Sequence, residues 1–297
     1  MAESEDALRL DRGRLRAAFD RASAGYEAAA ALQARVATEL LERLAAFEFA
    51  PRVVLDLGAG TGRVTRELKR RYPRALVIAL DLSPGMLREA RHNQLLWRRF
   101  VRLNADALRL PLAGACVDLV FSSLVLQWCE PLEQAFAEVR RVLSPEGFFA
   151  FSTLGPDTLK ELRAAWAAAD GLSHVHRFLD VHDVGERCTH AGLTEPVLDV
   201  DRLELAYPDT LALMRDLKAI GAHNVTAGRP RSLMGRARLA RMSEAYEALR
   251  RGGSLPATYE VIYGASWGAS DRARAAAHAG EVRIAPGSIR RRDARPP

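Results

Sequence analysis

A glycine-rich segment at the end of a short apolar run constrains the fold of this chain more than any other feature. Residues 53–62 read VVLDLGAGTG, and such an apolar run is typical of a strand buried on both faces of a sheet. Gly58, Gly60 and Gly62 permit a tight turn and a close approach of the backbone to a ligand. The helical pattern that follows, at 63–71, would aim free N–H groups at that turn. The segment therefore predicts a ligand site where a strand meets a helix in an α/β fold.

Strands and helices continue to alternate after this segment. Ser83 is a good N-cap residue and Pro84 suits the first helical position, so a helix begins there. The alternation comprises strands at 75–81, 100–103, 118–122 and 147–152 and helices at 63–71, 84–93 and 132–142. An amphipathic helix at 28–47 precedes it, and the later half is richer in helices, with strands near 196–205 and 258–267. Strict alternation predicts a parallel sheet with helices on both faces.

The composition is that of an ordinary folded protein. Of the 297 residues 48% are hydrophobic and 27% are charged, which excludes largely disordered and low-complexity chains. The net charge of +6 leaves nucleic acid, an acidic protein and an anionic small molecule open as partners. The acidic first residues, MAESED, exclude a secretory signal, and no apolar stretch is long enough to span a membrane. Three cysteines outside any CxxC pair predict neither disulfides nor a zinc site and fit a cytoplasmic location.

Two carboxylates stand where strands of the predicted sheet end. Asp81 closes the second strand, where a carboxylate can accept hydrogen bonds from both hydroxyls of a ribose. Asp106 follows the third strand, and Ala107 beside it leaves room for an adenine ring. The dinucleotide fingerprint GxGxxG requires glycine at position 63, but this chain has Arg63. The pattern therefore favours a ligand with adenosine but without pyrophosphate, unless these acids only cap strand ends.

In this order and spacing, residues 50–153 resemble the class I S-adenosylmethionine-dependent methyltransferases. The resemblance rests on LDLGAGTG, Asp81, the pair Asp106-Ala107, the strand DLVFSSLVLQW and the strand after LSPEG. It implies a Rossmann-like fold, with a mostly parallel seven-stranded sheet and helices on both faces. It also implies S-adenosyl-L-methionine as cofactor, no metal, and this set of cofactor-binding residues: Asp56, Gly58, Ala59, Gly60, Gly62, Asp81, Leu82, Asp106, Ala107 and Ser122. Within the set, Asp81 would hold the ribose, Asp106 the adenine amino group, and Ser122 would lie near the point of methyl transfer.

A narrower resemblance extends from about residue 19 to residue 268. FDRASAGYEAAAALQ, FSTLGPDTLKELRAAW, YPDTLALMRDLKAIGAHNVTAGRPR and PATYEVIYGASWG are similar to segments of the malonyl-acyl carrier protein O-methyltransferases of biotin synthesis. This implies methyl transfer to the free carboxylate of a malonyl thioester, borne by an acidic acyl carrier protein or by coenzyme A, with no nucleic-acid or membrane partner. Two alternatives stay open. One is a complex I assembly-type methyltransferase-like protein of the arginine hydroxylase group, and the other is an RNA-directed methyltransferase-like module, suggested by the Arg-rich C-terminal end.

The same resemblance divides the chain into parts. Residues 1–50 would form an N-terminal helical lid segment, and 51–270 a methyltransferase domain with a helical substrate insertion at about 206–256. Residues 271–297 are polar and rich in arginine, and we expect them to form a flexible tail.

Several residues outside the cofactor motif are candidates to act on the acceptor. Tyr26, in the lid segment, would contact the methionine end of the cofactor or the acceptor carboxylate, unless its ring only holds the lid segment in place by packing. Arg229, in the loop IGAHNVTAGRPR, could grip a carboxylate with two hydrogen bonds, unless this loop is simply solvated. We therefore expect Tyr26, Ser122 and Arg229 to position the acceptor carboxylate, and His223, Asn224 and Arg229 to bind the substrate.

Other conspicuous side chains are expected to have simpler roles. Four histidines lie in the second half: His174, His176, His182 and His190. They lack the spacing of metal ligands, so we expect ordinary polar residues. Five arginines follow the predicted substrate loop: Arg236, Arg238, Arg241, Arg250 and Arg251. Such a basic zone could steer an acidic carrier protein, although each charge alone suits a solvated helix face.

Overall fold

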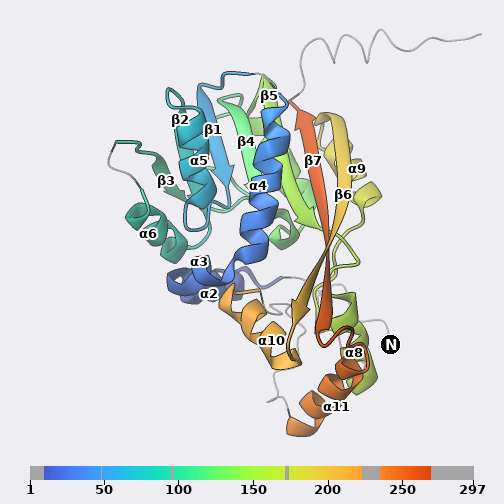
Figure 1. Cartoon of the computed structure of the whole chain (residues 1–297). Helices are drawn as coiled ribbons and strands as arrows, with labels where there is room; N and C mark the ends of the chain where they lie inside the picture. The colour runs from blue at the N-terminus through green and yellow to red at the C-terminus, as the bar shows by residue number, and fades with distance from the viewer. Residues whose placement is uncertain (1–9, 48, 95–96, 171–173, 223–234, 269–297) are drawn as a thin grey trace, which may run out of the picture.

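The computed structural model describes residues 10–47, 49–94, 97–170, 174–222 and 235–268. Within these ranges it confirms the predicted fold, a seven-stranded sheet in the order β3-β2-β1-β4-β5-β7-β6 (Figure 1). The strands are β1 (Val53–Leu57), β2 (Leu76–Asp81), β3 (Val101–Asn104), β4 (Val117–Ser123), β5 (Leu143–Leu154), β6 (Thr194–Tyr207) and β7 (Leu255–Trp267). Strands β1 to β5 pair in parallel, whereas β7 pairs antiparallel with both β5 and β6.

Helices cover both faces of the sheet, as the alternation predicts. They are α4 (Ala31–Ala45), α5 (Arg63–Arg71) and α6 (Pro84–His92) on one face and α7 (Leu132–Val142) and α9 (Val181–His190) on the other. Successive residues of β1, such as Val54 and Leu55, belong to the two opposite cores. A strand buried on both faces therefore reads as a continuous apolar run, which is the pattern that predicted β1.

The strand order reverses between β1 and β4, and ligand crevices of open α/β sheets form at the carboxyl ends of strands at such a point. The glycine turn that follows β1 lies at this edge. The chain of α2 (Arg12–Ala22), η1 (Ser23–Gly25) and α3 (Tyr26–Ala29) passes beneath it in Figure 1. The bounds of α2 are not evident in the sequence, because only Leu15 and Ala18 are buried and the apolar period is short.

Strands β6 and β7 are long and carry the chain beyond the rest of the sheet (Figure 1). Their pairing extends from Thr194 opposite Trp267 to Tyr207 opposite Leu255, with a register shift between Thr194 and Val197. Three helices gather near the far end of these strands: α8 (Lys160–Ala169), α10 (Thr210–Ala219) and α11 (Arg236–Glu247). In the described part of the chain, no helix is long and apolar enough to cross a membrane.

Candidate active site

The turn after β1 is built from glycines in conformations that other residues rarely adopt. Gly58, Gly60 and Gly62 have φ of +77°, +55° and +79°. A Cβ on Gly58 would lie 2.1 Å from Cγ2 of Val125, so only hydrogen fits there. A Cβ on Gly60 would meet no atom within 4 Å. The turn therefore presents bare backbone to open space.

Asp81, the last residue of β2, holds this turn in place. One carboxylate oxygen accepts a hydrogen bond from the N–H of Gly60 at 2.8 Å, and the other accepts one from the N–H of Ser83 at 2.8 Å. Burial raises the pKa of Asp81 to about 6, although these two hydrogen bonds lower it. Each oxygen keeps a second lone pair, so Asp81 can accept two more hydrogen bonds from ligand hydroxyls.

Asp56 lies deeper than Asp81, beneath the turn, and is 2% exposed. Its Oδ2 accepts a hydrogen bond from the hydroxyl of Thr65 in α5. Burial raises the pKa of Asp56 to about 7, the Thr65 hydrogen bond lowers it, and the charge of Asp81 raises it further. Asp56 therefore ties β1 to α5 and supports the turn from below.

A cavity of about 90 Å³, the glycine-turn cavity, opens beside these residues. The predicted cofactor residues that line it are Gly58, Gly60, Asp81, Leu82 and Ala107. The remaining predicted residues do not line it: Asp56, Ala59, Gly62, Asp106 and Ser122. Ser122 is fully buried and its hydroxyl donates to the carbonyl of Leu57, whereas Ser123 and Leu124 line the cavity.

The N-terminal segment is fastened to two parts of the rim of this cavity. Arg12 forms an ion pair with Asp106. Asp20 accepts hydrogen bonds from the hydroxyl of Ser83 at 2.6 Å and from the N–H of Gly85 at 2.8 Å, at the start of α6. Because the donors and acceptors include charged groups, these bonds are stronger than neutral ones and fix α2 over the cavity.

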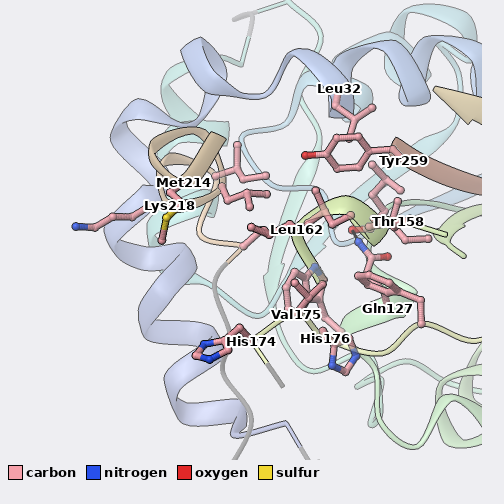
Figure 2. A pocket seen from close by; sticks show the side chains of 18 of the residues that line it. Leu32, Gln127, Thr158, Leu162, His174, Val175, His176, Met214, Lys218 and Tyr259 are labelled. Carbon is pink, nitrogen blue, oxygen red and sulfur yellow. Dashed lines mark hydrogen bonds between the residues drawn. The ribbon is translucent and has the colours of Figure 1, made fainter. Parts of the chain in front are cut away.

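A second cavity, of about 660 Å³, is lined by residues of α2, α8 and α10 and is called the large cavity below (Figure 2). Its wall is mostly apolar, with residues such as Leu32, Leu162 and Met214. Gln127 and Tyr259 are among its few polar groups. Burial raises the pKa of Tyr259 to about 12, so its hydroxyl is neutral. An apolar wall with few polar groups is typical of a site that binds an organic ligand.

The two cavities share four lining residues: Phe19, Tyr26, Leu124 and Trp128. The rings of Phe19 and Trp128 meet edge to face, with 5.7 Å between centroids. Burial, and then the charge of Asp81, raise the pKa of Tyr26 above its ordinary value, so the phenol is neutral. Groups bound in the two cavities would meet at this junction.

Two histidines that the sequence analysis treated as ordinary polar residues line the large cavity. His174 and His176 lie in the loop between α8 and α9. His174 stacks on Trp166, with 3.8 Å between ring centroids, and its Nε2 lies 3.0 Å from Asp170 Oδ1. His176 stacks on Trp128 at 6.2 Å, and burial lowers its pKa. The sequence carried no signal of this placement, because distant segments form the cavity.

The predicted substrate residues His223, Asn224 and Arg229, and the 271–297 tail, lie outside the described residues. Of the arginines that follow the loop, Arg241 donates to the carbonyl of Ala169 and Arg250 pairs with Glu247. These two arginines are therefore engaged in contacts within the protein.

The chain is similar to several known proteins. The family described as "Methyltransferase domain" matches residues 55–151. A malonyl-[acyl-carrier protein] O-methyltransferase of Methylovorus sp. (strain MP688) is 50% identical over 268 residues, which are 88% of this chain and 90% of that protein. The enzyme of the same name from Halorhodospira halophila is 48% identical over 289 residues, 97% of this chain and 98% of that protein. Phosphoethanolamine N-methyltransferase 2 of Haemonchus contortus, solved with S-adenosyl-L-methionine, shares the fold, with a TM-score of 0.52 and 17% identity over 84% of this chain and 57% of that one. Because the first two similarities are high over nearly the whole length, the chain belongs to the malonyl-[acyl-carrier protein] O-methyltransferase family.

Proposed function

We propose that the protein transfers the methyl group of S-adenosyl-L-methionine to the free carboxylate of a malonyl group held as a thioester on an acyl carrier protein. Its membership of the family carries the proposal. The junction of two cavities supports it, because methyl donor and acceptor must be aligned within one site. The arginine hydroxylase and RNA-directed alternatives are not favoured by these relatives.

The residues of the glycine-turn cavity fit the cofactor. At Gly60 the open space would be filled by any side chain, and the turn can lie against the methionine part. We assign the ribose hydroxyls to the buried carboxylate of Asp81, which has two lone pairs to offer. Leu82 and Ala107 line the same cavity, and we assign the adenine ring to their side of it, with Asp106 next to Ala107.

When bound, S-adenosyl-L-methionine supplies a methyl group on a positively charged sulfur, so the acceptor needs alignment more than activation. A carboxylate acceptor is already ionised at neutral pH, so no base among these side chains is required. We assign the alignment to the junction of the two cavities. There the neutral phenol of Tyr26 can donate a hydrogen bond to a carboxylate, while Phe19 and Trp128 exclude water.

The apolar wall of the large cavity favours binding of the uncharged product over binding of the charged acceptor. Burial of an ionised carboxylate in such a wall is costly, whereas a methyl ester carries no charge. Methyl transfer therefore removes an unfavourable charge from the cavity, which favours formation of the ester in place.

Mass spectrometry of the carrier protein tests this proposal. We expect purified protein, S-adenosyl-L-methionine and malonyl-carrier protein to give a mass gain of one methylene unit. Acetyl-carrier protein is the matched control, because it has the same thioester but no free carboxylate, and it should gain nothing. A lack of gain with both malonyl-carrier protein and malonyl-coenzyme A would overturn the proposal.

We also propose a cytoplasmic location. Cys116, Cys129 and Cys188 are all free, as suits a reducing compartment. Burial raises the pKa of the Cys129 and Cys188 thiols to about 12, so neither is a reactive thiolate.

A further inference from the structure

Four cations on three helices line the large cavity. Arg238 of α11 forms an ion pair with Asp170 at 3.9 Å, and the other three lie on two helices. Arg21 of α2 and Arg215 and Lys218 of α10 line the cavity yet remain exposed, which places them at its rim. Leu211, 53% exposed, lies on the same face of α10, because positions 211, 215 and 218 are separated by four and three residues. In Figure 2 the side chain of Lys218 points away from the cavity. The rim is therefore a basic surface that includes one exposed leucine.

Helices α2 and α10 border the same opening. A Cβ on Gly221, two residues after α10, would lie 3.3 Å from Cδ1 of Phe19 in α2. The end of α10 is therefore packed against α2, and a partner large enough to cover the opening would contact both helices.

The three rim cations lack acidic partners. Among the residues that the structure describes, no carboxylate pairs with Arg21, Arg215 or Lys218, and the one hydrogen bond from Arg215 goes to the carbonyl of Leu211 in its own helix. A cation in the last helical turn, such as Lys218, also suits the helix dipole, but Arg215 lies earlier in α10. Within the described part of the chain, no carboxylate therefore neutralises the charges at the rim.

A second basic groove, between α4 and α5, provides a contrast. It has a volume of about 680 Å³ and is lined by Arg63, Arg66, Arg70 and Arg71 among others. These four arginines donate hydrogen bonds within the protein, to glutamates in two cases and to backbone carbonyls in the other two. Two of these charges are paired with glutamates, Arg63 with Glu27 and Arg70 with Glu67, whereas none of the three rim cations has a carboxylate partner among the described residues.

The volume of the large cavity indicates which part of the thioester substrate lies inside it and which part lies at its opening. Its volume of about 660 Å³ falls in the range of sites for whole drug-sized ligands, roughly 300–1,000 Å³. A three-carbon malonyl group needs far less room. The arm that bears the thioester therefore fits inside with the malonyl group, and the molecule at the other end of that arm sits at the rim.

We propose that Arg21, Arg215, Lys218 and Leu211 form the docking surface for the protein part of the thioester carrier, which presents acidic side chains to the three cations. This inference rests on the proposed function. Complementary charges at an exposed rim mainly speed encounter and select the partner, and they are screened by salt. The surface therefore distinguishes a carrier protein from a small thioester that enters the same cavity.

A pair of variants and two substrates test the docking surface. Malonyl-carrier protein offers an acidic protein surface, whereas malonyl-pantetheine offers the same thioester without protein or phosphate. We expect Arg215→Glu/Lys218→Glu to lower the ratio of kcat/KM for malonyl-carrier protein to that for malonyl-pantetheine about tenfold, because two rim attractions become repulsions. Raising the salt concentration should lower the same ratio in the unaltered protein and much less in this variant. Arg215→Gln/Lys218→Gln should show a smaller loss.

Arg52→Glu/Arg74→Glu is the matched control, since it reverses two exposed charges near the amino ends of β1 and β2, at the opposite edge of the sheet. It should leave the ratio within about twofold. An unchanged, salt-independent ratio in the rim variants would overturn the docking surface while both substrates are still methylated. Failure of the unaltered protein to methylate either substrate would overturn the proposed function and the docking surface with it.

Discussion

Replacement of Asp81 by asparagine separates the contribution of this carboxylate to stability from its contribution to cofactor binding. Burial raises the pKa of Asp81 in the folded protein from 3.8 to about 6. A group whose folded-state pKa is raised stabilises the fold fully below its unfolded pKa, and that stabilisation is lost as pH rises through the folded value. Between pH 4 and pH 7 the shift corresponds to a loss of about 2 kcal/mol. Asp81→Asn cannot ionise and should not show this loss.

The same substitution should weaken cofactor binding. At pH 8 the ionised Asp81 would accept two charge-assisted hydrogen bonds from the ribose hydroxyls, and replacing the charge costs about 1.5–3 kcal/mol. We therefore expect the Kd for S-adenosyl-homocysteine to rise about ten- to a hundredfold. Below pH 6 the unaltered protein should lose affinity as Asp81 takes up a proton, whereas the variant should change little.

Two measurements on the same samples check these expectations. Urea unfolding from pH 4 to pH 8 gives the difference in unfolding free energy between the two proteins, and calorimetric titration with S-adenosyl-homocysteine gives the affinities. The difference reports the titration of Asp81 together with its coupling to Asp56, because the charge of Asp81 contributes to the raised pKa of Asp56 and is absent in the variant. A stability difference that does not vary with pH would refute the raised pKa. Equal affinities at pH 8 would refute the assignment of Asp81 to the ribose.

The remaining predictions concern the turn, the N-terminal segment and the tail. Gly58→Ala should destabilise the protein by more than the roughly 1–2 kcal/mol that a left-handed backbone conformation costs a non-glycine residue, since its Cβ would overlap Val125. Gly60→Ala should lower the thermal unfolding temperature less than Gly58→Ala does, while calorimetry should show weaker cofactor binding. Asp20→Ala removes the acceptor for Ser83 and Gly85, so we expect KM for S-adenosyl-L-methionine to rise about tenfold and limited proteolysis near α2 to accelerate. An unaltered rate of cleavage would show that these hydrogen bonds do not hold α2 to the start of α6. Deletion of 272–297 should leave methyl transfer largely intact in the mass assay, and a complete loss would place the tail in the site.

The fold could be predicted because its signals are local. Strands β1, β2 and β4 are mostly buried runs of five to seven residues, and each crossover helix has its own apolar stripe, so the alternation is visible without tertiary contacts. The exceptions follow the same logic. Helix α2 buries only Leu15 and Ala18, and its other contacts, such as the bonds of Asp20, are with residues far along the chain. No periodicity could reveal them.

The glycine-turn cavity could be predicted from the sequence, whereas the large cavity could not. Gly58, Gly60 and Asp81 belong to adjacent strands and turns, so motif spacing was enough to bring them to one cavity. The large cavity is assembled from α2, the loop of His174 and His176, and α10. None of the three rim cations was predicted from the sequence, and Arg250 of the predicted basic zone is paired with Glu247 within the protein. Charge in a sequence becomes informative only when its partners are known.

The N-terminal segment contributes to the glycine-turn cavity, the large cavity and the proposed docking surface. Phe19 and Tyr26 line both cavities, Asp20 clasps the segment to the start of α6, and Arg21 lies at the rim next to that clasp. Because a single segment forms part of both walls, any displacement that admits water or ligand to one cavity also disturbs the other. A carrier protein that pairs with Arg21 would hold the segment down while its malonyl group is in the cavity. If the acceptor carboxylate is aligned at the junction of the two cavities, as proposed, docking at the rim would thereby help to keep water away from it.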